Sequence, residues 1–128
     1  MILSFVFYAA SLAPLTDSGK HPIDKQLEIC LKQPYSTRTQ AACYNTAYTA
    51  WEKDIAVSEK LLLAKEKQKD KIRAAQKAWE KERDAEFNKI AEHYNQMRGT
   101  GYISVRIKLR MEVLRKRALE LEAQLKKL

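Results

Sequence analysis

The chain has 128 residues, of which 45% are hydrophobic and 31% are charged, with only three glycines and three prolines. This length favours a single domain with one core, and so few turn-forming residues exclude a sheet of many short strands. We therefore expect an all-α protein, a small helical bundle. The net charge of +8 indicates a basic surface.

The N-terminal residues 2–13 form an apolar run of 12 residues without a charged side chain. The run is too short for a membrane-spanning helix of about 20 residues but matches the core of a signal peptide. The linker-like stretch PLTDSGKH follows at 14–21. We predict a signal-like segment and linker over 1–21, a folded domain over 22–128, and a periplasmic or secreted location. A buried N-terminal helix is the alternative for the same run.

A short helix is predicted to begin at Pro22, because proline suits the first helical position, and to end before Pro34. The next helix is predicted to begin in a capping box. In that box the Thr37 side chain caps the third backbone N–H and Gln40 reaches back.

Residues 35–98 contain neither glycine nor proline. Two apolar stripes at helical spacing flank a polar stretch, AKEKQKDK, at 64–71. One unbroken helix would be about 90 Å long and could bury its stripes only against another chain. We predict instead a long helical hairpin that turns near residues 65–69.

The stretch RGTG at 98–101 marks the clearest break between helices. The C-terminal helix that follows has a heptad seam of apolar residues: Ile107, Met111, Leu114, Ala118, Leu121, Leu125 and Leu128. The seam requires a partner, either within the chain or in a second copy, which would make a homo-oligomer.

Positive charge is concentrated in two segments. Residues 60–81 and residues 106–128 each hold eight Lys or Arg against three acids. These segments could bind anionic polymers such as nucleic acid or envelope polyanions, although such runs are usually solvated helix faces.

Cys30 and Cys43 are the two cysteines of the chain. In an exported protein an even pair at this spacing predicts a disulfide, whereas in the cytosol two buried thiols are expected. We predict no metal site, because His21 and His93 are not at ligand spacing with the cysteines. No recognisable catalytic motif is present, so we expect no enzyme, no cofactor and no small-molecule substrate.

Four stretches make the chain resemble a known family: IDKQLEICL, TQAACYNTAYTAWEKDI, AAQKAWEKERDAEF and GTGYISVRIKLRMEVLRKRALELEAQL. It is similar to the LprI-like N-terminal domain family, named for a lysozyme inhibitor. The resemblance implies a helical, exported protein of the bacterial cell envelope with a Cys30–Cys43 bridge. It also implies an envelope protein as partner, such as a lysozyme or another muralytic enzyme.

The resemblance rests most on the two cysteines with Trp51 behind them and on a second group of motif residues. We assign structural roles to Trp51 and to this second group: Gln76, Trp79, Arg83 and Asp84. Gln76, Trp79 and Arg83 are spaced by three and four and share one helix face, so we expect them to face a neighbouring helix, with Trp79 in the core. Asp84 is expected to pair with a cation on another helix rather than with Arg83.

Many members of the family carry a second cysteine pair, whose positions correspond to Phe87 and Leu109 here. A packing contact between these two side chains is predicted to replace the bridge. The net positive charge opposes binding to a cationic lysozyme. Any such binding therefore requires a local acidic surface, for which the sequence offers Glu80, Glu82, Asp84 and Glu86.

Overall fold

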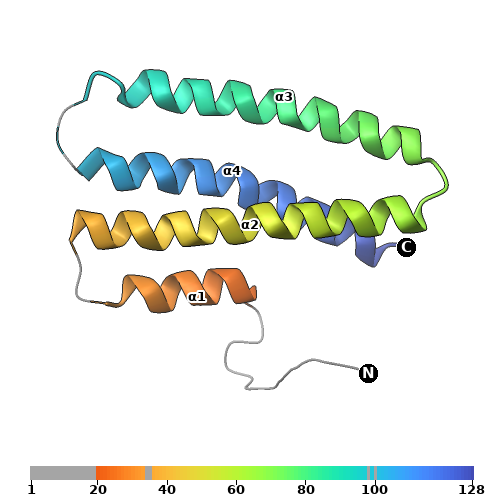
Figure 1. The fold of residues 1–128 in the computed structure, drawn as a ribbon, viewed down its shortest axis with the longest axis horizontal. Coiled ribbons are helices and arrows are strands. Elements are labelled where there is room, and N and C mark those ends of the chain that lie inside the picture. Colours follow the sequence, from red (N-terminus) through yellow and green to blue (C-terminus); the bar gives the residue numbers. More distant parts are fainter. Residues whose placement is uncertain (1–19, 34–35, 98, 100) are drawn as a thin grey trace.

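The computed structural model describes residues 20–33, 36–97, 99 and 101–128. These residues form four helices: α1 (Pro22–Leu31), α2 (Thr37–Lys65), α3 (Lys69–Tyr94) and α4 (Gly101–Lys126). α2 and α3 form the long hairpin, and α4 runs back along it and crosses behind α2 in the view of Figure 1. The predicted all-α bundle is confirmed. The signal-like apolar run lies outside the described residues.

Local sequence explains where α1 and α2 begin. Pro22 occupies the first turn of α1, and the Nδ1 atom of His21 caps it by accepting the Ile23 backbone N–H at 3.1 Å. The predicted cap of α2 is wrong by one residue. Ser36 has an extended backbone, and its Oγ accepts the Thr39 N–H at 3.2 Å, so the helix begins at Thr37.

The predicted hairpin turn is confirmed. α2 ends at Lys65, the extended backbone of Glu66 breaks the helix, and α3 begins at Lys69. The alternative of one unbroken helix is therefore wrong. No glycine or proline marks this turn. The turn forms because it lets the apolar stripes of α2 and α3 pack within one chain, which buries apolar surface.

The core lies between α2 and α4. The heptad seam of α4 packs on the α2 stripe, so its partner is found within the chain. The buried core side chains are Cys43, Ala47, Trp51, Ile55 and Leu62 of α2 with Met111, Leu114, Ala118 and Leu121 of α4. Leu125 is only partly buried and Leu128, beyond the end of α4, is 54% exposed, so the seam frays at its end.

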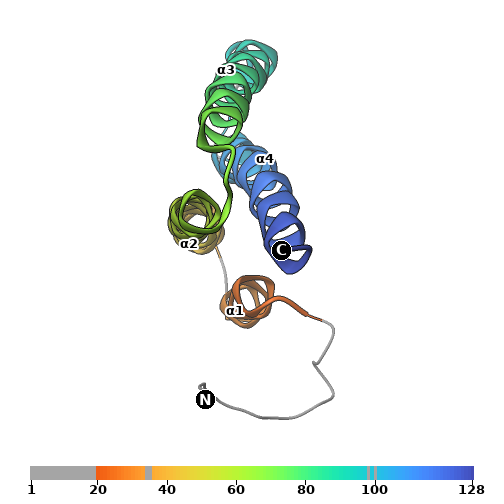
Figure 2. The same ribbon diagram turned by 90° about the vertical axis from the view of Figure 1, so that its right-hand side faces the viewer.

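α1 and α3 lie on opposite sides of the α2–α4 pair (Figure 2). Neither helix has a fully buried residue. The disulfide between Cys30 and Cys43, with 5.7 Å between the Cα atoms, joins the end of α1 to α2 and confirms the predicted staple. Among the described helices none is long and apolar enough to cross a membrane.

Candidate functional site

Three of the five motif residues gather where α3 faces α4. Gln76, Trp79 and Arg83 share the face predicted for them, and all three are partly buried. Arg117 of α4 reaches across to this face: its Nη2 donates to Gln76 Oε1 at 3.1 Å. Its guanidinium also lies 5.6 Å from the centre of the Trp79 ring. The motif is therefore an α3–α4 contact built around one arginine of α4.

Trp79 differs from its predicted place in the core. The ring is only partly buried, at the edge of the core cluster, because α3 packs beside α4 rather than between two helices. Arg83 lies over it at 5.3 Å, on the same helix. Two guanidinium groups thus hold the ring by cation–π contacts.

The predicted pairing of Asp84 is wrong. Its Oδ1 atom accepts from Arg83 Nε at 3.0 Å, so the adjacent residues form an ion pair on the surface of α3. Arg83 can reach its neighbour because its side chain lies along the outside of the helix, 32% exposed. Phe87, also on α3, lies beside Tyr48 of α2, with 6.3 Å between the ring centres. The contact between Phe87 and Leu109 stays a prediction.

An open groove of about 580 Å³ lies over this contact, between α3 and α4. Trp79, Ala85 and Val113 supply apolar lining. The charged lining consists of Glu82, Glu86, Glu112 and Glu120 with Arg83, Lys116 and Arg117. All four glutamates are exposed, and two of them are paired with cations of their own helix, Glu86 with Lys89 and Glu120 with Arg117.

The groove is suited to binding rather than to catalysis. Its four carboxylates stand on exposed helix surfaces, and two of them pair with cations of their own helix. Hydrolysis of a glycoside instead requires two carboxylates that face each other across a cleft. A groove that combines a partly exposed aromatic side chain with four acids and three cations can accept a charged surface that is partly apolar at its centre.

Trp51, the fifth motif residue, lies elsewhere. It is completely buried, and its ring packs against His21 with 4.5 Å between ring centres. Arg115 lies 5.9 Å from the same ring and makes a two-pronged salt bridge to Asp24 of α1, with contacts of 2.9 and 2.7 Å. Trp51 therefore anchors the junction of α1, α2 and α4 and does not belong to the groove.

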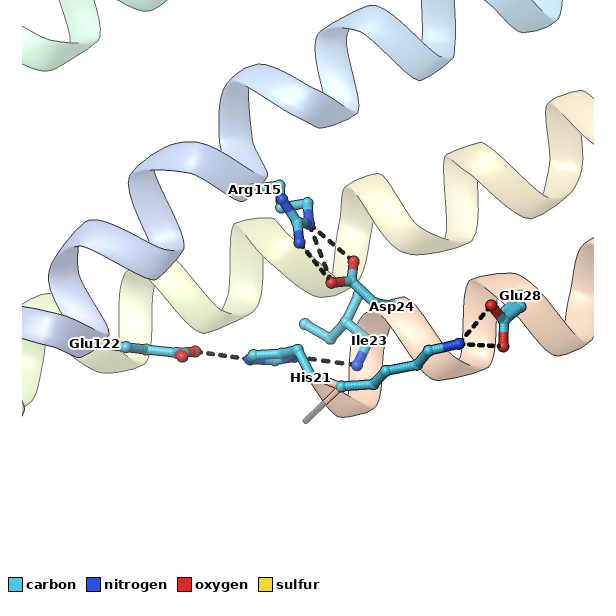
Figure 3. Close-up of polar contacts among 7 residues, drawn as sticks. His21, Ile23, Asp24, Glu28, Arg115 and Glu122 are labelled. Atoms are coloured by element: carbon cyan, nitrogen blue, oxygen red, sulfur yellow. Dashed lines mark hydrogen bonds and ion pairs between the residues drawn. The ribbon is translucent and has the colours of Figure 1, made fainter. Parts of the chain in front are cut away.

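A cluster of titratable groups that the sequence did not reveal lies beside Trp51. His21, Asp54 and Glu122 each offer one nitrogen or oxygen atom, and these atoms lie within 4.8 Å of one another. His21 Nε2 is 2.8 Å from Glu122 Oε2 (Figure 3). Burial, reinforced by the Glu122 carboxylate, raises the pKa of Asp54 to about 7. Burial acts in the same direction on Glu122, but hydrogen bonds to Asp54 and His21 outweigh it and lower the pKa of Glu122.

Helical spacing in the sequence could have predicted part of this cluster. Asp54 follows Trp51 by three residues, and Glu122 follows Arg115 by seven, so each pair shares a face of its helix. Which faces meet depends on how α2 and α4 cross, and that angle is not encoded in any one helix.

One comparison with known proteins gives a match. The sequence profile described as "Lysozyme inhibitor LprI" matches residues 30–121, which include both cysteines and all of the motif residues. No curated protein and no solved structure matches the chain.

Proposed function

Since the chain belongs to the Lysozyme inhibitor LprI family, we propose that it is an exported, periplasmic or secreted protein that binds a lysozyme-type enzyme through the α3–α4 groove. The observation that carries the proposal is the lining of this groove, which brings four glutamates together with the partly exposed Trp79 and three cations on a chain whose net charge is +8.

Charge explains why the groove, rather than another face, is the docking surface. A cationic enzyme is repelled by the protein as a whole, so only a local concentration of acids can guide it to contact. The partly exposed Trp79 ring supplies an apolar anchor of the kind that dominates binding energy at protein interfaces. Its two arginine neighbours keep the ring in place before the enzyme arrives.

A charge reversal tests the proposal. Glu82→Lys places a cation in the groove, so the affinity for a cationic lysozyme should fall by about tenfold or more, as measured by surface plasmon resonance. The matched control is Glu92→Lys, an exposed acid of the same helix that does not line the groove. Both variants change the net charge by the same amount, so they differ only in location.

Retention of affinity in Glu82→Lys, or an equal loss in both variants, would contradict docking in the groove. The melting temperature of each variant shows that the fold is intact. Inhibition assays on the same samples then report whether the bound enzyme is also blocked.

Binding to an anionic polymer is the second candidate function, and one feature favours it. The turn between α2 and α3 and the C-terminal end of α4 lie at the same end of the molecule (Figure 1). Exposed lysines gather on these segments: Lys65, Lys67, Lys69, Lys126 and Lys127. This basic end is where an acidic polymer would bind.

A salt series separates the two functions in the same binding experiment. Binding of a polyanion releases counterions, so its affinity falls steeply between about 50 and 200 mM salt. Added salt instead screens the overall repulsion between two basic proteins, so enzyme docking in the groove should weaken little.

A further inference from the structure

The start of α1 is held to the bundle by polar groups that the proposed docking surface does not use. His21 stands immediately before α1, Asp54 lies in the middle of α2, and Glu122 lies near the end of α4. All three side chains are partly buried. In Figure 3 the His21 ring bridges the backbone of α1 and the Glu122 carboxylate.

Hydrogen bonding fixes the position of the imidazole proton. His21 Nδ1 accepts the Ile23 backbone N–H at 3.1 Å, so this nitrogen carries a lone pair. A neutral ring then has its proton on Nε2, which donates it to Glu122 at 2.8 Å. A ring in this state cannot ligate a cation through Nε2, so the geometry does not favour a metal ion at this cluster.

Asp54 needs a proton of its own. Its Oδ2 atom is inaccessible to solvent, and no hydrogen-bond donor among the described residues faces it. The Glu122 carboxylate interacts directly with Asp54, and as an anion it has no proton to offer. A single proton on Asp54, donated to Glu122, satisfies both side chains and removes the repulsion between them.

We propose that His21, Asp54 and Glu122 form a proton-sharing clamp that fastens the start of α1 to α2 and α4 and that loosens when Asp54 ionises. The Glu122 carboxylate is the acceptor at its centre, accepting one hydrogen bond from His21 Nε2–H and one from the protonated Asp54 carboxyl.

The surroundings confine any movement to the first turn of α1. Lys126, one turn further along α4, acts on Glu122 and favours its anionic form. The Asp24–Arg115 ion pair joins α1 to α4 beside the cluster, and the disulfide fixes the other end of α1 at Cys30. Loss of the shared proton should therefore free residues around His21 and leave the helix attached to the bundle.

The direction of the pH effect follows from the two states of the chain. An unfolded Asp has a pKa of about 3.9, whereas Asp54 has a pKa of about 7 in the folded protein. Folding therefore takes up a proton between these values, and stability from this proton is present at acidic pH and is lost as the pH rises to about 7.

The test uses Asp54→Asn, whose amide remains a donor to Glu122 at every pH. The ¹³C resonance of the Asp54 carboxyl in the wild-type protein should titrate with a midpoint near 7. The melting temperature of the wild type should fall relative to that of Asp54→Asn by roughly 5 °C or more between pH 5 and pH 8. Exchange of the Ile23 amide, which His21 caps, should accelerate relative to the variant over the same range.

Glu52→Gln is the matched control, because it removes a solvent-exposed acid from the same helix and should reproduce the wild-type pH profile. A midpoint below about 5, in the ordinary carboxyl range, or parallel melting profiles for wild type and Asp54→Asn would overturn the proposal. Stabilisation of the wild type by micromolar Zn²⁺, absent in Asp54→Asn, would also overturn it in favour of a metal site.

Discussion

At the level of single residues, the two tryptophans have different roles. Trp51 is fully buried at the junction of three helices, whereas Trp79 lies at the edge of the core with part of its ring facing the groove. Both rings lie next to arginines, Arg115 for Trp51 and Arg117 for Trp79. A family motif thus contains one residue that supports the fold and one that is also available to a partner.

Substitution of the tryptophans should reveal this difference in chemical denaturation. Trp51→Ala should lower the free energy of unfolding by about 3–5 kcal/mol, because a large cavity opens in a packed site. Trp79→Ala should lower it by about 1–2 kcal/mol. The Trp79 ring is already partly exposed in the folded protein, so unfolding exposes less additional apolar surface than it does at Trp51. Equal losses in the two variants would mean that Trp79 is a core residue, as its helical spacing alone predicts.

At the level of helices, α1 depends on its attachments. It contributes no buried residue, so the disulfide, the Asp24–Arg115 ion pair and the His21 cluster together hold it in place. In the chain-entropy view, a bridge that closes a 13-residue separation contributes about 3 kcal/mol.

Cys30→Ser should therefore lower the free energy of unfolding by about 2–5 kcal/mol. Cys30 is the better position to change than Cys43, because Cys43 is buried and a hydroxyl there would add its own desolvation cost. Circular dichroism should show little loss of helix at low temperature, since the α2–α4 core is untouched. An unchanged melting temperature in non-reducing buffer would show that the bridge contributes nothing.

The sequence predicted the helices better than the contacts between them. Pro22 and the break at 98–101 mark helix ends through local backbone chemistry, and the stripes on α2 and α4 identify the core faces. The cap was misplaced because Ser36 and Thr37 are chemically equivalent candidates. The hairpin turn could be placed only by the lack of apolar residues to bury, not by a turn residue.

The candidate site was only half visible in the sequence. The face shared by Gln76, Trp79 and Arg83 follows from spacing along α3, but their partner Arg117 is 41 residues from Gln76. Of the four acids on α3 that the sequence offered as a patch, Glu82 and Glu86 line the groove, whereas Glu80 and Asp84 do not. That Glu112 and Glu120 of α4 complete the acidic lining depends on packing between helices.

At the level of the whole molecule, charge is sorted by place. Exposed lysines gather at the end formed by the α2–α3 turn and the C-terminus, whereas the groove between α3 and α4 is lined by four glutamates, one lysine and two arginines. In the proposed function, the glutamates of the groove attract a cationic partner that the rest of this basic protein repels. The two proposed functions therefore use different parts of the same molecule.

The proposed docking of a lysozyme-type enzyme over the α3–α4 groove can be tested by fluorine NMR. The chain contains two tryptophans, so 5-fluorotryptophan labelling gives two ¹⁹F resonances, which Trp79→Phe assigns. Titration with an unlabelled cationic lysozyme should shift or broaden the Trp79 resonance and leave that of Trp51, which is buried away from the groove, unchanged. A complex that forms while the Trp79 resonance stays unchanged would contradict the claim.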